Sequence, residues 1–357
     1  MNRKEKELFF ELCKFCQPNK DKIAKLIEDG GATPELLGML FANRVAGIAH
    51  GVLNECGLLY KVDREFRTSL INASVINEKI IDDFYECVKY LTPILDSCDV
   101  PYALLKGAYL CCKYPKRYRT SNDIDILISP DDVGKISEML KKAGFRQGEM
   151  KNGEFVAASR KQIIESKMTR GETVPFIKPT NLLFVKNMEV DINFSLDYKN
   201  SDDEILKKML SRTQKIGLGV SHIRTLDNFD FILHLCAHLY KEATTMPWIK
   251  MKRDMTFYKY CDIYMMLSSF SEEENKKLLD RSRENHLETE LAYCIKSIES
   301  FFGILCGIKS EDFVEIRALD EVVAPKEKKI YRYTETDLVK RFFANDRSKL
   351  LMEERNE

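Results

Sequence analysis

The stretch that decides the fold is Asp-Ile-Asp-Ile-Leu-Ile at residues 123–128, which follows Leu-Lys-Gly at residues 105–107. In a β-strand, successive side chains point to opposite faces, so Asp123 and Asp125 share one face and the isoleucines line the other. Two carboxylates this close repel each other unless a hard cation such as Mg²⁺ neutralises them, and Mg²⁺ favours one or two carboxylates together with substrate phosphates. The stretch therefore predicts a metal and nucleotide site. The alternative is a solvated polar strand face, because Asp-x-Asp pairs also arise by chance.

A phosphate-binding turn is expected just upstream of this strand. Residues 102–105 are apolar and predict a short buried strand that ends at Lys106 and Gly107. A glycine lets the backbone come close to a phosphate, and Lys106 adds a point charge. Residues 109–114 indicate a helix that would direct its first amides toward the same anion.

The loop before the two aspartates carries further candidate nucleotide ligands. Arg117, Arg119 and Ser121 lie there, and with Lys106 and Gly107 they form the predicted nucleotide-binding set. An arginine this close to two aspartates can equally form a structural salt bridge, so both interpretations stand for the arginines.

A second acidic strand is expected downstream. Residues 182–185, a turn at 186–187 and residues 188–196 predict a β-hairpin whose second arm alternates apolar and polar side chains. Asp191 lies in the middle of that arm, where a charge needs a partner. If the arm lies beside residues 123–128, then Asp191 converges with Asp123 and Asp125, and the three can hold two Mg²⁺ ions.

These motifs resemble those of the DNA polymerase β-like nucleotidyltransferase superfamily, in particular its branch of uncharacterised bacterial nucleotidyltransferases that carry Leu-Lys-Gly. The likeness covers roughly residues 35 to 270. It implies that Asp123, Asp125 and Asp191 bind two Mg²⁺ ions, or Mn²⁺ in their place, and that Gly107 approaches the phosphates of an NTP co-substrate.

The chain departs from the family pattern at two positions. Ala108 stands where the wider superfamily usually has Gly or Ser to bind phosphate. Asn193 stands where members of the branch often have His, two residues after the third aspartate. Neither departure removes a metal ligand, and both concern how phosphate is handled and how the acceptor is positioned.

Composition limits the classes of partner and compartment. The 357 residues include 56 Lys and Arg and 56 Asp and Glu, so the formal net charge is zero, which argues against binding extended nucleic acid through charge alone. The eleven cysteines are scattered and odd in number, which favours reduced thiols over a disulfide framework. No signal peptide or membrane-spanning segment is predicted, so we expect a cytoplasmic protein.

Helical regions are expected on both sides of the core. The predicted organisation is an N-terminal helical region at residues 1–98, a catalytic core at 99–200, and a C-terminal helical region at 201–357 whose end from Pro325 either packs as a last helix or is mobile. The predicted helices cover residues 4–16, 20–28, 33–56, 64–98, 129–144, 229–242, 252–267, 272–285 and 288–305. The fold class is therefore α+β, with a mixed-sheet nucleotidyltransferase core between helical regions.

The sequence predicts an enzyme that moves an NMP from an NTP to a hydroxyl or phosphate of a small molecule or peptide, with release of pyrophosphate. In that case His238, Tyr240 and Trp248 are expected to line an enclosed acceptor cleft. One rival is an RNA-directed or toxin-like nucleotidyltransferase, which requires a basic groove. The other is a non-catalytic nucleotide-binding regulator, against which the three intact carboxylates argue.

Overall fold

The chain divides into two compact units. The computed structural model describes residues 1–196, 203–218, 221–303, 308–309, 313, 317–325 and 327–354. One unit, the sheet unit, runs from Asn72 to Phe231, and the other, the helical unit, combines Met1–Ile71 with Ile232–Glu357. The predicted boundaries at residues 98 and 200 divide the chain by expected function rather than by contacts. They stay predictions.

The sheet unit is built on a six-stranded mixed sheet with the strand order β1-β2-β6-β5-β3-β4. The neighbouring strands β2 and β6 are parallel, and all other neighbours in this sheet are antiparallel. The α+β fold class with a mixed sheet is thus confirmed. Its strands are β1 (Tyr102–Leu104), β2 (Asp123–Ile128), β3 (Arg146–Lys151), β4 (Glu154–Ala157), β5 (Phe176–Pro179) and β6 (Asn187–Asn193).

Alternation of side chains explains how β2 and β6 pair. Ile124 pairs with Val190, and Ile126 pairs with Ile192, so the two strands present one continuous apolar face. All four side chains are at most 1% exposed. Burial of β-branched side chains on this face stabilises the pair and fixes its register, because a slip of one residue would turn the isoleucines outward. The opposite face is left to the acidic residues.

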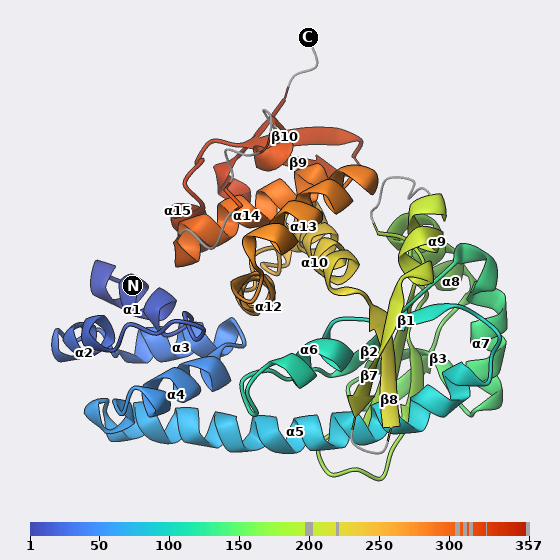
Figure 1. Ribbon diagram of the computed structural model, residues 1–357, viewed down its shortest axis with the longest axis horizontal. Coiled ribbons are helices and arrows are strands. Elements are labelled where there is room, and N and C mark those ends of the chain that lie inside the picture. Colours follow the sequence, from blue (N-terminus) through green and yellow to red (C-terminus); the bar gives the residue numbers. More distant parts are fainter. Residues whose placement is uncertain are drawn as a thin grey trace. The chain divides into compact units, whose positions relative to one another are not determined.

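Helices and a second hairpin complete the sheet unit. The long helix α5 (Arg64–Asp96) extends into it from residue 72 onward, and Figure 1 shows α5 as one continuous helix. Tyr102 at the start of β1 donates a hydrogen bond to Asp96 at the end of α5, at 2.7 Å. The other elements are α6 (Gly107–Lys113), η2 (Pro130–Asp132), α7 (Val133–Lys142), α8 (Arg160–Arg170), α9 (Asp203–Ser211), β7 (Thr213–Leu218) and β8 (Ser221–Leu226).

The hairpin predicted around residues 182–196 has a different first arm. Residues 182–185 form no strand, and β5 is the antiparallel partner of β6 instead. The apolar residues Leu183 and Phe184 are 71% and 41% exposed, so this apolar run does not mark a buried strand. The Asp83 carboxylate of α5 holds the loop by accepting hydrogen bonds from the amides of Phe184 and Val185, at 2.6 and 3.2 Å.

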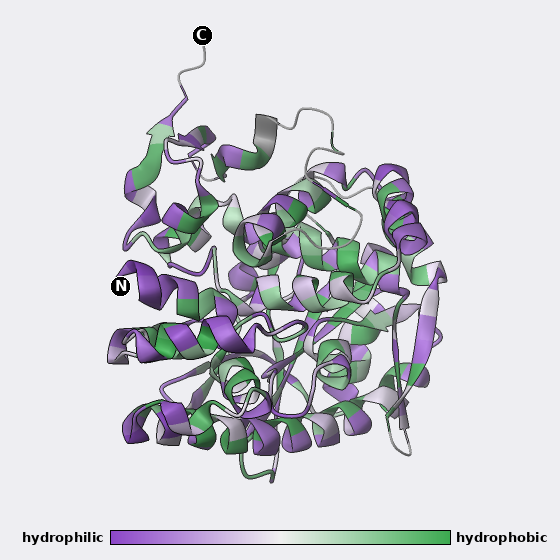
Figure 2. Ribbon diagram, turned by 60° about the vertical axis from the view of Figure 1, so that its left-hand side comes forward, coloured by the Kyte–Doolittle hydropathy of each residue, from purple (hydrophilic) through white to green (hydrophobic). Residues whose placement is uncertain are grey.

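The helical unit packs amphipathic helices around an aromatic core. Figure 2 shows its helices with hydrophobic and hydrophilic stripes, which is the pattern of helices that bury one face. The rings of Phe9, Phe257 and Phe342 lie 4.9 to 5.4 Å apart between centroids. The elements are α1 (Arg3–Glu11), α2 (Lys20–Glu28), α3 (Pro34–Ala42), α4 (Ala46–Glu55), η1 (Leu59–Lys61), α10 (Asn228–Ala243, which begins in the sheet unit), α11 (Met246–Lys250), α12 (Tyr258–Ser268), α13 (Glu272–Glu284), α14 (Glu288–Phe302), η4 (Arg317–Asp320), β9 (Glu321–Ala324), β10 (Lys329–Tyr333), α15 (Leu338–Phe342), η5 (Arg347–Leu350) and β11 (Leu351–Glu353).

The single helix predicted at residues 33–56 is two helices. Arg44 adopts a left-handed backbone with φ of 58°, which ends α3 before α4 begins. The buried Asn43 beside it uses its side-chain oxygen to accept a hydrogen bond from the amide of Phe257, at 3.0 Å. This contact ties the α3–α4 junction to the start of α12, and no local sequence pattern reveals it.

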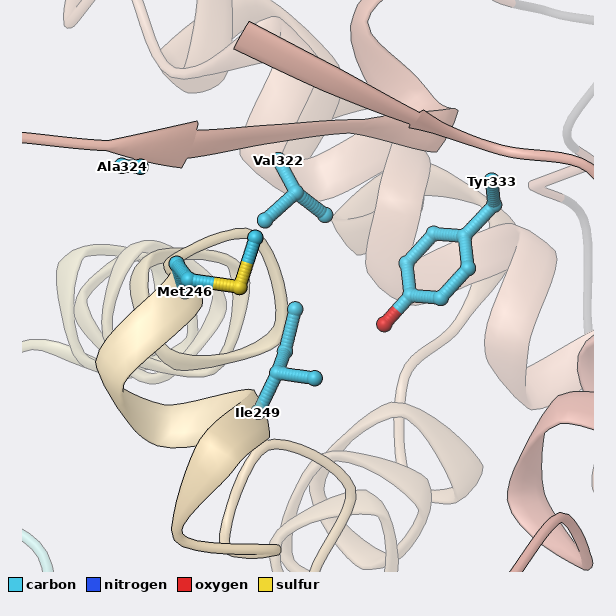
Figure 3. Packing of buried hydrophobic residues seen from close by; sticks show 5 residues of the cluster. All are labelled: Met246, Ile249, Val322, Ala324 and Tyr333. Atoms are coloured by element: carbon cyan, nitrogen blue, oxygen red, sulfur yellow. The ribbon is translucent and has the colours of Figure 1, made fainter. Parts of the chain in front are cut away.

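The region after residue 201 was predicted to be helical, but it is not helical throughout. It also contains the β7–β8 hairpin and a three-stranded sheet of order β11-β10-β9. Figure 3 shows how this second sheet is anchored: Val322 and Ala324 of β9 and Tyr333 of β10 pack against Met246 and Ile249 of α11. The described part of the segment after Pro325 therefore folds as strands and short helices, of which α15 packs as a helix but is not the whole segment.

No helix in the described parts of the chain is both long enough and apolar enough to cross a membrane.

Candidate functional site

The parallel pairing of β2 with β6 brings the predicted carboxylates together. Asp125 lies opposite Asp191, and Asp123 lies opposite Glu189. Residues at the same register of neighbouring strands share a face, and such strands lie roughly 4.8 Å apart. Four carboxylates therefore lie on one face of the sheet, which we call the acidic face. The expected neighbourhood of the two strands is confirmed.

A fifth carboxylate, Glu172, joins the acidic face from a loop that the sequence analysis did not single out. Glu172 bridges to Asn193, two residues beyond Asp191 on β6. The bridge is held by the amide of Thr173, which donates to the carbonyl of Ile192 at 2.9 Å. The signal in the sequence is slight. Gly171 ends α8 with φ of 66°. The next residue, Glu172, lies at the site only because it pairs with Asn193, which is distant in the sequence.

A lysine and an asparagine both bind one oxygen of Asp125. Lys106 Nζ lies 2.7 Å from Asp125 Oδ1, and Asn193 Nδ2 donates to the same oxygen at 3.2 Å. Asn193 Nδ2 also donates to the carbonyl oxygen of Asp191, at 3.3 Å. Asn193 thus connects the two facing aspartates.

Gly107 packs directly on Ser121. A Cβ added to Gly107 would meet both Oγ and Cβ of Ser121 at less than 3.0 Å, a separation that real Cβ atoms essentially never show. Ser121 Oγ in turn lies 3.3 Å from the carbonyl oxygen of Asp123 and 3.4 Å from its Oδ1. Packing alone therefore requires glycine at position 107, because the turn lies against the loop that leads into β2. Its predicted contact with phosphate stays a prediction.

The two predicted arginines differ in their surroundings. Arg117 Nη2 pairs with Glu78 of α5 at 2.7 Å, whereas the sequence suggested a salt bridge to Asp123 or Asp125. Arg119 is buried, and its guanidinium donates to the carbonyl oxygen of Thr120. The structure thus gives Arg117 a salt bridge that was not predicted, and a phosphate contact for either arginine stays a prediction.

The electrostatics of the acidic face favour a bound cation. Burial raises the pKa of Asp191 well above its ordinary value, and the charges of Asp125, Asp123, Glu172 and Glu189 raise it further. Burial also raises the pKa of Asp125, and the Lys106 ammonium offsets this only in part. The pKa of Glu189 is raised by burial and then by Asp123 and Asp125. The charged form of each group is thus disfavoured until positive charge is supplied.

The carboxylates of the acidic face fit Mg²⁺ as part of its ligand set, but they do not form a complete site by themselves. Across the described ranges, no group of three or more His, Cys, Asp or Glu side chains is arranged to hold a metal ion by itself. Asp125 and Asp191 are nevertheless hard oxygen donors side by side, and Asp123 is on the same face. This arrangement suits an ion that takes one or two carboxylates from the protein and its other ligands from substrate phosphates. It does not suit a cage built from protein alone.

The three predicted acceptor residues lie in the helical unit. His238 Nε2 lies 3.3 Å from Glu242 Oε1, and the ring of Tyr240 lies 5.6 Å from that of Tyr293. The Lys259 ammonium lies 5.9 Å from the centroid of Trp248 and pairs with the Glu242 carboxylate. His238 and Trp248 thus lie beside the ion pair of Lys259 and Glu242, which the sequence did not reveal. Their contact with an acceptor stays a prediction.

Comparison with known proteins shows which family the sequence matches. The family described as "Uncharacterised nucleotidyltransferase" matches residues 31–303. Among solved structures, an antigenic nucleotidyltransferase-like protein from Paracoccidioides brasiliensis is similar over 66% of this chain and 94% of its own, with 14% sequence identity and a TM-score of 0.36. A likeness at this level supports no conclusion about the site. No curated protein matches the chain.

Proposed function

Because the chain belongs to the family of uncharacterised nucleotidyltransferases, we propose that it is a metal-dependent enzyme that transfers an NMP from an NTP to a small molecule or peptide. The acceptor atom is a hydroxyl or phosphate oxygen, which displaces pyrophosphate from the α-phosphorus. One observation carries the proposal: the register that sets Asp125 opposite Asp191 and Asp123 opposite Glu189 on one face of the sheet.

The carboxylates of Asp123, Asp125 and Asp191 would hold Mg²⁺ or Mn²⁺, two ions in the full complex with the nucleotide. When bound, such ions neutralise the phosphates and lower the pKa of an acceptor hydroxyl. The excess negative charge of the acidic face supports this assignment, since burial and neighbouring carboxylates raise the pKa of both Asp125 and Asp191, and a bound cation would offset this.

The turn at Lys106 and Gly107 would position the triphosphate. Lys106 Nζ lies beside Asp125, so its charge is at the site where the phosphates meet the metal. Ser121, Arg117 and Arg119 come from the loop that packs against this turn or follows it. Orientation by such fixed groups is the protein's main contribution to phosphoryl transfer, because the reaction needs little covalent chemistry from side chains.

The acceptor would bind with help from His238, Tyr240 and Trp248. The zero net charge of the chain supports a small or peptidic acceptor over extended RNA. We also propose that the protein acts in the reducing cytoplasm, which the odd number and scattered positions of its eleven cysteines favour.

A transfer assay tests the proposal. The protein is incubated with each NTP labelled at the α-phosphate, with Mg²⁺ or Mn²⁺ and a fractionated cell extract, and both pyrophosphate and labelled products are measured. We expect pyrophosphate release coupled to labelling of a small-molecule or peptide fraction. Label on RNA would favour the RNA-directed rival. Nucleotide binding without pyrophosphate in any fraction would favour the regulator.

A matched pair of variants makes the assay specific. Asp191→Asn should abolish transfer, because it removes one ligand of the facing pair. Asp131→Asn is the same chemical change in the same unit, at a side chain that is 81% exposed and outside the acidic face, and it should retain full activity. Wild-type activity in Asp191→Asn would contradict the proposed metal site.

A further inference from the structure

The two facing aspartates of the acidic face, Asp125 and Asp191, differ in the charged groups that contact them. The Asp125 side chain is 4% exposed and has an ammonium, Lys106 Nζ, 2.7 Å from Oδ1. Asp191 lies directly opposite, and within the described residues no cation or hydrogen-bond donor contacts its carboxylate. One member of the pair therefore has a counter-ion built into the chain, and the other has none among the residues that the structure describes.

The backbone holds Lys106 in this position. Lys106 has φ of 42° and ψ of −116°, a conformation that side-chain-bearing residues rarely adopt. The turn cannot easily relax on either side, because the Leu105 amide donates to the carbonyl of Asp125 at 2.9 Å and Gly107 is pressed against Ser121. A strained residue between two fixed neighbours is consistent with a side chain that must point at one atom.

Lys106 and a metal ion would compete for the same carboxylate. Asn193 and Lys106 both bind Oδ1 of Asp125, so that oxygen already has two donors. An ion shared by Asp125 and Asp191 would bring a second positive charge against the ammonium, and like charges this close repel. The described residues form no ready three-ligand group, which agrees with a site that a side-chain cation already occupies in part.

We propose that Lys106 is a resident counter-cation of the acidic face, which neutralises Asp125 in the metal-free protein and must leave it when a divalent ion binds. The ammonium that is released is then available to the phosphates of the nucleotide. This inference rests on the proposed function for the metal itself. It adds that the protein alone binds divalent ions weakly, so that metal and nucleotide enter together.

The test measures Mn²⁺ binding without nucleotide, by the loss of the free-ion electron paramagnetic resonance signal. Lys106→Met should bind Mn²⁺ about tenfold more tightly than wild type, because a competing cation is removed and a tenfold change corresponds to the worth of one modest ion pair. Lys106→Gly is the second variant, since glycine adopts positive φ without strain and should fold even if Lys106→Met does not. Lys135→Met is the control. It removes an exposed lysine 3.2 Å from Asp132, and its Mn²⁺ affinity should equal that of wild type.

A measurement on the wild-type chain gives an independent readout. Brief acetylation followed by peptide mass spectrometry should show that Lys106 becomes several-fold more reactive when Mn²⁺ is added, with Lys113 and Lys135 unchanged as internal references. Equal or weaker Mn²⁺ binding by both Lys106 variants would overturn the inference while leaving the metal site intact. Absence of Mn²⁺ binding even with NTP present would overturn the metal site of the proposed function as well. Competition without any transfer activity would support the inference and count against the proposed reaction.

Discussion

Gly107 and Ser121 are in direct contact, backbone against side chain, at the turn that precedes the acidic face. No Cβ fits at residue 107, because both Oγ and Cβ of Ser121 occupy its place. The sequence predicts that Gly107 approaches the phosphates, so a larger residue at this position would be expected to act on nucleotide binding. The contact changes that expectation, since a larger residue must first displace the loop that leads into β2.

Gly107→Ala should therefore destabilise the protein by about 1–3 kcal/mol, the usual range for overpacking a close contact. Ser121→Gly in the Gly107→Ala background should recover most of this loss, whereas Ser121→Ala should not, because its Cβ still clashes. The measurement is the free energy of unfolding in urea. Gly134→Ala in α7, where a Cβ meets nothing within 4 Å, is the control and should be neutral or stabilising. Equal effects of Ser121→Gly and Ser121→Ala would show that the contact is not the cause.

Asp191→Asn should stabilise the metal-free protein while abolishing transfer. The charged form of Asp191 is disfavoured by burial and by four neighbouring carboxylates, and asparagine keeps the shape without the charge. We expect a gain of about 1 kcal/mol in the free energy of unfolding, measured in EDTA at neutral pH. Asp131→Asn should leave this free energy unchanged within experimental error. A less stable Asp191→Asn protein would mean that the carboxylate has a favourable partner that outweighs its neighbours.

The acidic face was the part of the protein most open to prediction, for a physical reason. Alternation is strict along residues 123–126 and 188–193, and burial of Ile124, Ile126, Val190 and Ile192 leaves one register for the pair. Helices such as Lys20–Glu28 were predictable because one helix face is apolar over their whole length.

The errors share a different cause, which is interaction between residues far apart in the chain. Leu183 and Phe184 form an apolar run that is exposed, in a loop whose Phe184 amide donates a hydrogen bond to the Asp83 carboxylate. Asn43 interrupts a helix because its partner is Phe257. Strand β7 contains only two aliphatic residues, Ile216 and Leu218, and β9 is only four residues long, so their pattern alone does not separate them from loops. Glu172 belongs in the same group, since only its bridge to Asn193 brings it to the site.

Glu11 of α1 gives the helical unit a defined pH dependence. Burial alone would raise the pKa of Glu11, but the ammonium groups of Lys14 and Lys22, each 2.9 Å away, lower it overall. A carboxylate with a lowered folded-state pKa adds stability above its unfolded pKa of about 4.3, and this stability is lost as pH falls through the folded value.

We thus expect Glu11→Gln to lose about 1 kcal/mol at pH 7 and less at each step below pH about 4.3. The quantity to measure is the difference in unfolding free energy between variant and wild type across pH. Glu7→Gln, in the same helix and at an exposed ion pair with Arg3, should show a smaller difference at pH 7. A constant Glu11→Gln difference down to the lowest pH at which both proteins fold would contradict the assignment.

The ion pair between Arg347 and Asp254 ties the C-terminal segment to the helical unit. Asp254 is 0% exposed, and Arg347 donates to both of its carboxylate oxygens, at 2.5 and 2.6 Å. Arg347→Met should destabilise the protein by about 3–5 kcal/mol, because it leaves a buried carboxylate without its cation. Adding Asp254→Asn to that variant should recover part of the loss. Arg332→Met is the matched control. It breaks exposed pairs with Glu321 and Glu354, so it should cost under about 1 kcal/mol. The readouts are urea unfolding and the rate of proteolysis after residue 320. If Arg347→Met accelerated cleavage of that segment without lowering the unfolding free energy of the rest, the segment would be a separate appendage and not part of the helical unit's core.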